Sequence, residues 1–112
     1  MSIVTKLQFK KRPKPSKISD LMEVIRRHLD EGRYLDTRHA TQRGWERGIT
    51  RPEILQVLRR GYHDKSRDRF DENFGAWNYA VKGKTVDLRS LRIIVSIDPS
   101  GMLIITAIDL EK

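Results

Sequence analysis

The stretch LRIIVSIDPSGMLIITAID, residues 91–109, decides the fold of this chain. Its two halves, 91–97 and 102–108, are rich in β-branched and aliphatic residues, which favour strands. Between them, Pro99 presets the backbone for a turn and Gly101 can adopt a positive φ angle. The sequence therefore predicts a β-hairpin. Because apolar residues occupy both faces of these strands, we expect them at the centre of a sheet.

One further strand is predicted upstream of the hairpin. Trp77, Tyr79 and Val81 alternate with polar or small residues, as in a strand that buries one face. Gly75 and Gly83 bracket this segment. The predicted sheet is therefore an antiparallel meander of three or four strands.

Three helices are predicted before the sheet, from apolar residues at helical spacing and from capping residues at their ends. The third has a capping box, because Glu53 follows Thr50 by three residues. The first is expected from Ser19 or Asp20 to Gly32, the second from Asp36 or Thr37 to Arg47, and the third from Thr50 to Gly61. The sequence thus predicts an α+β fold, with N-terminal helices packed on one face of a curved three- to four-stranded antiparallel sheet.

The charge is concentrated at the N-terminus. The formal net charge is +8, and six basic residues precede the first acidic one, Asp20. We therefore expect residues 1–17 to form a basic flexible arm and residues 18–112 to form a single domain. Such an arm is either a solvated tail or a segment that tracks phosphates. Its candidate substrate-binding residues are Lys10, Lys11 and Arg12.

Several function classes are disfavoured by what the sequence lacks. It has no cysteine, no apolar run long enough to span a bilayer and no signal-peptide pattern, so we expect a cytoplasmic protein that does not bind membranes. His28 and His63 lack metal-ligand spacing and are expected at the surface. Neither a metal nor a cofactor is predicted.

The densest polar cluster is RHATQRGWERGI, residues 38–49. On a helix, His39, Arg43 and Glu46 lie within about 60° of one another, with Arg47 at the margin. Metal-independent RNA cleavage needs a proton-transfer group, which histidine supplies near neutral pH, and fixed positive charge beside the phosphorane, which arginine supplies. The same spacing also fits a surface ion pair between Arg43 and Glu46, with His39 simply exposed.

Aromatic and basic residues of the predicted sheet are further candidates. Trp77 and Tyr79 share one strand face, where they could stack bases or offer a phenol as an acid, although such residues more often pack in a core. Arg89, Arg92 and Thr106 could line a phosphate site on the sheet, or could have ordinary packing roles.

The order of these features resembles a bacterial domain-of-unknown-function family of small proteins related to the BrnT and RelE toxins. His39-Ala40, Arg43 and Glu46-Arg47-Gly48-Ile49 are similar to that family's pattern of a histidine, a spaced arginine and an E-R-G-I ending. The capped helix that reaches Gly61 and the closing hairpin complete a resemblance over about residues 36–109. It implies a RelE-like or barnase-like fold and an RNA-cleaving toxin held inactive by an acidic antitoxin.

Two functional hypotheses follow. The first is a metal-independent endoribonuclease toxin of a type II toxin–antitoxin system, acting on free or ribosome-bound RNA. In it His39 acts as general base or acid, Arg43 and Arg47 stabilise the phosphorane, and Tyr79 assists or stacks a base. The alternative is a non-catalytic nucleic-acid-binding or adaptor protein that uses the basic arm and the arginine face.

Overall fold

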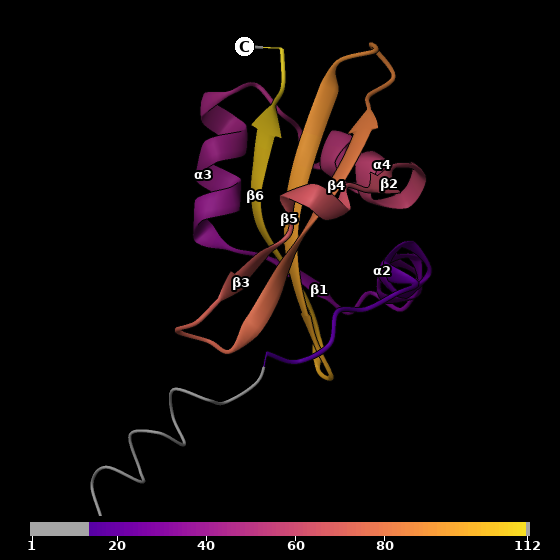
Figure 1. The fold of residues 1–112 in the computed structure, drawn as a ribbon. Helices are drawn as coiled ribbons and strands as arrows, with labels where there is room; N and C mark the ends of the chain where they lie inside the picture. Colours follow the sequence, from indigo (N-terminus) through magenta and orange to yellow (C-terminus); the bar gives the residue numbers. More distant parts are fainter. Residues whose placement is uncertain (1–13, 112) are drawn as a thin grey trace, which may run out of the picture.

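The computed structural model describes residues 14–111, except the side chains of Arg43 and Trp45. Lys10, Lys11 and Arg12 therefore lie outside the described residues. The described part contains three α-helices, one 3-10 helix and six strands (Figure 1). In chain order these are α2 (Leu21–Asp30), β1 (Tyr34–Asp36), α3 (Arg38–Glu46), α4 (Arg51–Arg60), β2 (Tyr62–His63), η1 (Lys65–Arg67), β3 (Arg69–Asp71), β4 (Ala76–Lys84), β5 (Ser90–Asp98) and β6 (Gly101–Asp109).

The sheet is larger than predicted and is mixed rather than antiparallel. Its strand order is β1-β6-β5-β4-β2, with β3 also paired to β4, and β1 runs parallel to β6. The α+β class is confirmed, whereas the prediction of a purely antiparallel sheet of three or four strands is wrong. The three additional strands have only two or three residues each, which is too short for an alternating pattern to be recognised in the sequence.

The closing hairpin is confirmed as the centre of the sheet. β5 lies between β4 and β6, and the register of the hairpin shifts between Ile94 and Val95. The turn is held by the Asp98 carboxylate, which accepts the amide of Ser100 at 2.7 Å. Gly101 does not adopt the positive φ angle that the sequence suggested. A side chain is excluded there for another reason, because a Cβ atom would lie 3.0 Å from the carbonyl oxygen of Arg33.

Local capping signals place the helices where the sequence predicts them. Gly32 and Gly48, which follow α2 and α3, both have φ angles of +66°. The capping box of α4 is present, since the Thr50 hydroxyl accepts the Glu53 amide and the Glu53 carboxylate accepts the Thr50 amide. The Thr37 hydroxyl accepts the amide of Ala40 and so caps α3.

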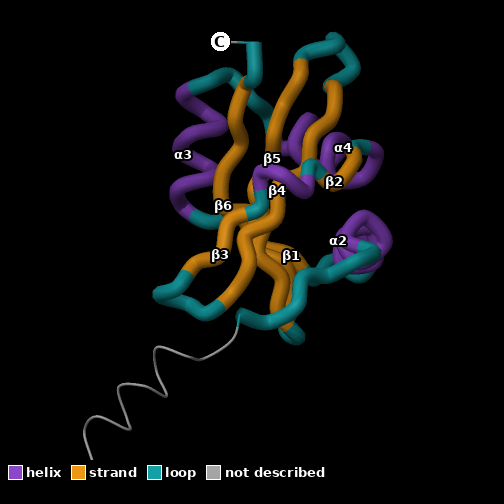
Figure 2. The backbone as a smooth tube through the Cα atoms, viewed as in Figure 1, coloured by secondary structure: helices purple, strands orange, loops and turns teal. Residues whose placement is uncertain are grey.

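The α-helices pack against one face of the sheet and its β6 edge. Ile25 of α2 and Leu58 of α4 are fully buried in one cluster with Ile93 and Val95 of β5, while α3 runs alongside β6 (Figures 1 and 2). The alternate residues point to the opposite face, over which only η1 lies. We call this the helix-free face. It comprises Tyr62 of β2, Arg69 of β3, Asn78, Ala80, Lys82 and Lys84 of β4, Arg92, Ile94 and Ser96 of β5, and Thr106 and Ile108 of β6.

The last residues of the predicted arm contact the domain. The indole Nε1 of Trp77 donates to the carbonyl oxygen of Pro15 at 2.8 Å, and the Lys17 ammonium lies 2.7 Å from the Asp68 carboxylate. One residue later, the Ile18 amide donates to the Tyr79 hydroxyl at 3.0 Å. Residues 14–17 were expected to be flexible, but they lie against β4 and its neighbours.

A buried aspartate fills a gap in the sheet beside β4. Between the residues of β4 that pair with β2 and those that pair with β3, the Ala80 amide donates to Asp68 Oδ1 at 2.9 Å. Asp68 Oδ2 accepts His63 Nε2 at 2.8 Å and pairs with Lys17. Burial alone would raise the pKa of Asp68, but hydrogen bonds from Lys17, Ala80 and His63 together lower the pKa below its usual value.

His63 is therefore not the surface residue that the sequence suggested. Only 8% of its side chain is exposed, and its ring packs edge-on against Tyr79. The sequence could not predict its burial, because His63 lies among polar residues and in a strand of only two residues. So short a strand has no periodicity from which an inward-facing side chain could be recognised.

Candidate nucleic-acid interface

Three of the four predicted catalytic residues lie in helix α3 or directly after it, and their environments differ. His39 is exposed in the first turn of α3. Arg43 belongs to the same helix, but its side chain lies outside the described part. Arg47, just beyond the helix, donates from Nη1 to the carbonyl oxygen of Ala107 in β6 at 2.6 Å. The structure thus gives Arg47 a bond that ties α3 to the sheet.

The predicted aromatic candidates on β4 face the helices. Tyr79 is 3% exposed, and its hydroxyl accepts the Ile18 amide. Trp77 is half-buried against Phe70, with ring centroids 5.4 Å apart, and its indole nitrogen is bonded to Pro15. Both rings therefore have partners within the fold. This agrees with the alternative, left open by the sequence, that they pack in the core.

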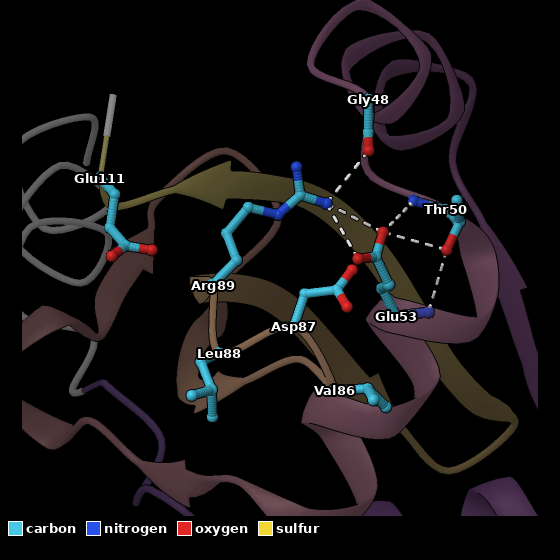
Figure 3. Close-up of a pocket in the computed structure, with 8 residues that line it drawn as sticks. All are labelled: Gly48, Thr50, Glu53, Val86, Asp87, Leu88, Arg89 and Glu111. Atoms are coloured by element: carbon cyan, nitrogen blue, oxygen red, sulfur yellow. Dashed lines mark hydrogen bonds and ion pairs between the residues drawn. The ribbon is translucent and has the colours of Figure 1, made fainter.

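Arg89 lies in the wall of a pocket and is held there by carboxylates (Figure 3). Its guanidinium donates to both oxygens of Glu53, at 2.9 and 3.0 Å, and to the carbonyl oxygen of Gly48 at 3.0 Å. Burial alone would raise the pKa of Glu53, but hydrogen bonds from Thr50 and the charge of Arg89 lower the pKa below its usual value. Asp109 lies 3.6 Å from a second guanidinium nitrogen. Arg89 therefore joins the start of α4 to the sheet.

The pocket beside Arg89 is not the strongest candidate for binding nucleic acid. It has a volume of about 760 Å³ and is lined by Gly48, Thr50, Glu53, Val86, Asp87, Leu88, Arg89 and Glu111. Three of these residues are acidic, and the single arginine is already paired with one of them. Carboxylates repel phosphates, so a polyanion is not expected there.

Arg92, like Thr106, is a predicted substrate-binding residue of the described chain that lies on the helix-free face. Its neighbours across the sheet are Lys82 in β4 and Ile108 in β6, and Lys82 in turn lies opposite Tyr62 in β2. Residues directly opposite each other on paired strands share a face. Tyr62, Lys82, Arg92 and Ile108 therefore form one row across four strands, which we call the Tyr62 row.

The Tyr62 row combines an exposed aromatic ring with positive charge. Tyr62 of β2 is 56% exposed, whereas Tyr79 of β4 is buried. Arg92 lies 3.4 Å from Asp64, and its Nε atom is buried without a hydrogen-bond partner among the described residues. Thr106 and Ser96, also on this face, add hydroxyl groups. An aromatic face, fixed cations and hydroxyl groups are the groups with which proteins hold bases, phosphates and sugars.

Unpaired cations gather around this face. Lys82 and Lys84 of β4 and Lys65 and Arg67 of η1 form no ion pair with any described residue. η1 crosses in front of β4 in Figure 1 and follows Asp64, which is bonded to Arg92. On the helices, four cations form no ion pair among the described side chains, namely Arg26 and Arg27 of α2, Arg38 of α3 and Arg60 of α4. These four are divided among three helices, whereas the four around the helix-free face lie on β4 and the adjoining η1.

Sequence reasoning did not single out Tyr62 or Lys82. Tyr62 lies in residues 62–70, which are polar and show no regular pattern in the sequence. It is placed on the helix-free face by a strand of only two residues. Lys82 was one of the polar residues that alternate with the apolar face of β4, a pattern that predicts solvent exposure but not a function. Only the register of β2 on β4 brings the two side chains together.

Neither a cluster of metal-ligating residues nor a membrane-spanning helix is found in residues 14–111. Within residues 14–111, no group of three or more His, Asp or Glu residues could hold a metal ion. None of the helices in this range is long and apolar enough to cross a bilayer.

No curated protein matches this chain, and no solved structure does. One family model matches residues 37–109, namely Domain of unknown function (DUF4258). The match begins at Thr37, which caps α3, and ends at Asp109, the last residue of β6. It therefore includes His39, Arg47 and all of the helix-free face, and it leaves out α2 and β1. The expected membership of a domain-of-unknown-function family is confirmed, and the chain belongs to the DUF4258 family.

Proposed function

We propose that this protein binds single-stranded RNA on its helix-free face. The observation that carries the proposal is the Tyr62 row, in which an exposed ring lies beside Lys82 and Arg92 on a sheet face that no α-helix of the described chain covers. Bases that are free of a duplex can stack on such a ring, and the cations can pair with the phosphates on either side.

The distribution of charge supports the same proposal. The whole chain carries +8, and four of the basic residues, Lys6, Lys10, Lys11 and Arg12, precede the described part. The segment that follows them, residues 14–18, lies against β4 through Trp77, Tyr79 and Asp68. Both groups of cations, those at the N-terminus and those around the helix-free face, add to the attraction of the protein for a polyanion.

The binding test uses two variants of the Tyr62 row and one matched control. Tyr62→Ala is expected to weaken binding of a labelled single-stranded RNA by about 5- to 150-fold, because stacking of one base contributes roughly 1–3 kcal/mol. Lys82→Ala is expected to lower the salt dependence of log K by about 0.7, the contribution of one phosphate contact. Fluorescence anisotropy over a salt series measures both quantities.

The control for this test is Arg27→Ala, which removes an exposed cation from α2 on the helix side of the molecule. It should leave the salt slope nearer the wild-type value than Lys82→Ala does. If Arg27→Ala and Lys82→Ala weaken binding equally, and Tyr62→Ala has no effect, the helix-free face is not the binding surface.

The second candidate function is the endoribonuclease toxin that the resemblance to BrnT and RelE implies. It is favoured by His39, which is exposed at the start of α3, the helix that runs along the β6 side of the helix-free face. In this proposal His39 transfers the proton, Arg43 contributes positive charge, an acidic antitoxin inhibits the protein, and the RNA is free or held on a ribosome. A RelE-like arrangement of the sheet belongs to the same proposal.

Cleavage of labelled RNA in EDTA tests the second candidate. His39→Ala should lower the cleavage rate by about 10²- to 10⁴-fold, the usual contribution of a proton-transfer group. The matched control is His28→Ala, because His28 lies on α2 and its Nδ1 atom is bonded to the Val24 carbonyl oxygen. Equal rates for wild type and His39→Ala would remove His39 from the mechanism.

A further inference from the structure

The loop between β3 and β4 presents an aromatic ring to solvent. Phe74 is 84% exposed, more than any other large hydrophobic residue in the described chain. The loop protrudes at the lower left of Figures 1 and 2, away from the three α-helices. A fully solvated phenylalanine adds nothing to the core, and it costs solubility unless something covers it.

The loop is built to hold this ring outward. Asp71 Oδ1 accepts the amides of Asn73 at 2.9 Å and of Phe74 at 3.3 Å. Gly75 has a φ angle of +63°, a conformation that lets the chain return directly into β4. None of these bonds uses the ring. The conformation is thus fixed by backbone and carboxylate groups, while the side chain is left available.

The stem of the same hairpin connects Phe74 with the helix-free face. On that face Arg69 of β3 lies opposite Asn78 of β4, and Asp71 lies opposite Ala76. On the other face, Phe70 packs edge-on against Trp77, which anchors the stem to the rest of the sheet. The loop is therefore a rigid extension of the surface that begins at the Tyr62 row.

We propose that Phe74 is a second base-stacking site and that the RNA runs from Tyr62 over the outer side of η1, which lies across β4 where Ala80 is buried, to Phe74. Six residue steps along β4 lead from Lys82, opposite Tyr62, to Ala76 at the base of the loop, a span of roughly 20 Å at about 3.3 Å per residue. Stacked nucleotides advance about 3.4 Å each, so this span corresponds to about six nucleotides, and to fewer when the strand is extended. Arg69 and Asn78 lie between the two rings.

The inference deepens the proposed function and rests on it. The ligand is a single strand, because a duplex has no bases free to stack on two separated rings. Base stacking tolerates any sequence, since every base has a π face, so the track predicts a length requirement rather than a sequence requirement.

The experiment measures binding of labelled oligouridylates of two to ten nucleotides by wild type and by three Phe74 variants. Wild-type affinity should rise with length up to about six nucleotides and then level off, apart from the gradual statistical gain of longer chains. Phe74→Ala should weaken binding of the longer oligonucleotides by about 5- to 150-fold and leave the two-nucleotide ligand unchanged. Phe74→Trp should bind like wild type, whereas Phe74→Leu, which is apolar but not aromatic, should behave like Phe74→Ala.

The matched control is Val86→Ala, which shortens another strongly exposed apolar side chain, 79% exposed, in the β4–β5 loop. It should leave every affinity unchanged. Wild-type binding that depends on Tyr62 but not on Phe74 at any length would overturn this inference and leave the proposed function standing. Phe74→Leu binding as tightly as wild type would overturn it too, because a side chain without a π face would then serve equally well. Absence of RNA binding by wild type would overturn both proposals.

Discussion

Replacing Asp68 by asparagine tests how the sheet is held together beside β4. The wild-type carboxylate is 1% exposed and accepts three donors, the Ala80 amide, His63 Nε2 and the Lys17 ammonium. Asparagine keeps the shape and can retain one acceptor oxygen for Ala80. It removes the negative charge and turns an NH₂ group toward His63 or Lys17, both of which are donors in the wild-type protein.

The expected cost follows from this arrangement. Removing one partner from a buried, hydrogen-bonded charge pair destabilises a protein by about 3–5 kcal/mol. Because the Ala80 bond is retained and Lys17 is partly exposed, we expect the lower end, about 3 kcal/mol. In a domain of this size each kcal/mol lowers Tm by about 4–8 °C, so Asp68→Asn should lower Tm by roughly 12–24 °C.

The contribution of Asp68 should also depend on pH. Its folded pKa lies below its usual value, so the stabilisation is fully present above the unfolded pKa, about 3.9, and is lost as the pH falls through the folded pKa. The difference in unfolding free energy between wild type and Asp68→Asn should therefore be constant near neutrality and shrink below about pH 4.

Thermal and urea unfolding, followed by circular dichroism from pH 3 to 7, measure these differences. The control is Glu72→Gln, which neutralises an exposed carboxylate in the neighbouring β3–β4 loop and should change stability by less than about 0.5 kcal/mol. If Asp68→Asn is as stable as this control at pH 7, the reasoning about the gap beside β4 is refuted.

Three further predictions concern single contacts, and urea unfolding measures each one. Thr50→Ala removes the capping box with Glu53 and should cost about 1 kcal/mol, and a cost near zero would contradict the role of the cap. Arg47→Gln loses the charge-assisted bond to Ala107 and should cost about 1.5–3 kcal/mol, whereas unchanged stability would make Arg47 free for a functional role. Gly61→Ala places a Cβ atom 2.5 Å from a backbone oxygen and should cost at least about 2 kcal/mol, so a stable, well-folded variant would show that α4 can shift against β4.

The sequence predicts those parts of the fold that are specified locally. A capping box, a glycine after a helix and a pair of long apolar strands each act over a few residues, so α4, the ends of α2 and α3, and the β5–β6 hairpin are all predicted correctly. The strands β1, β2 and β3 depend instead on partners far along the chain. Their two or three residues carry no pattern of their own.

The candidate site could be predicted only in part, for the same reason. The sequence names Arg92 as a candidate near the central strand, and the structure places it on the helix-free face. Its neighbour Tyr62 lies 30 residues earlier and reaches this face through the register of β2. Arg89 looked equivalent to Arg92 in the sequence. The difference between them is that Glu53 and Asp109 surround Arg89, and both residues come from other elements.

The carbonyl groups along the outer edge of β6 are occupied by neighbouring elements of the chain. β1 covers this edge only from Met102 to Ile104. Beyond this stretch, the Thr37 hydroxyl donates to the carbonyl oxygen of Ile105 at 3.1 Å, and the Arg47 guanidinium donates to the carbonyl oxygen of Ala107. A long apolar strand with free carbonyls would be a template for other copies of the chain. The side chains of Thr37 and Arg47 occupy these two carbonyl groups. A strand from another copy of the chain would therefore find no continuous row of free carbonyl groups along this edge.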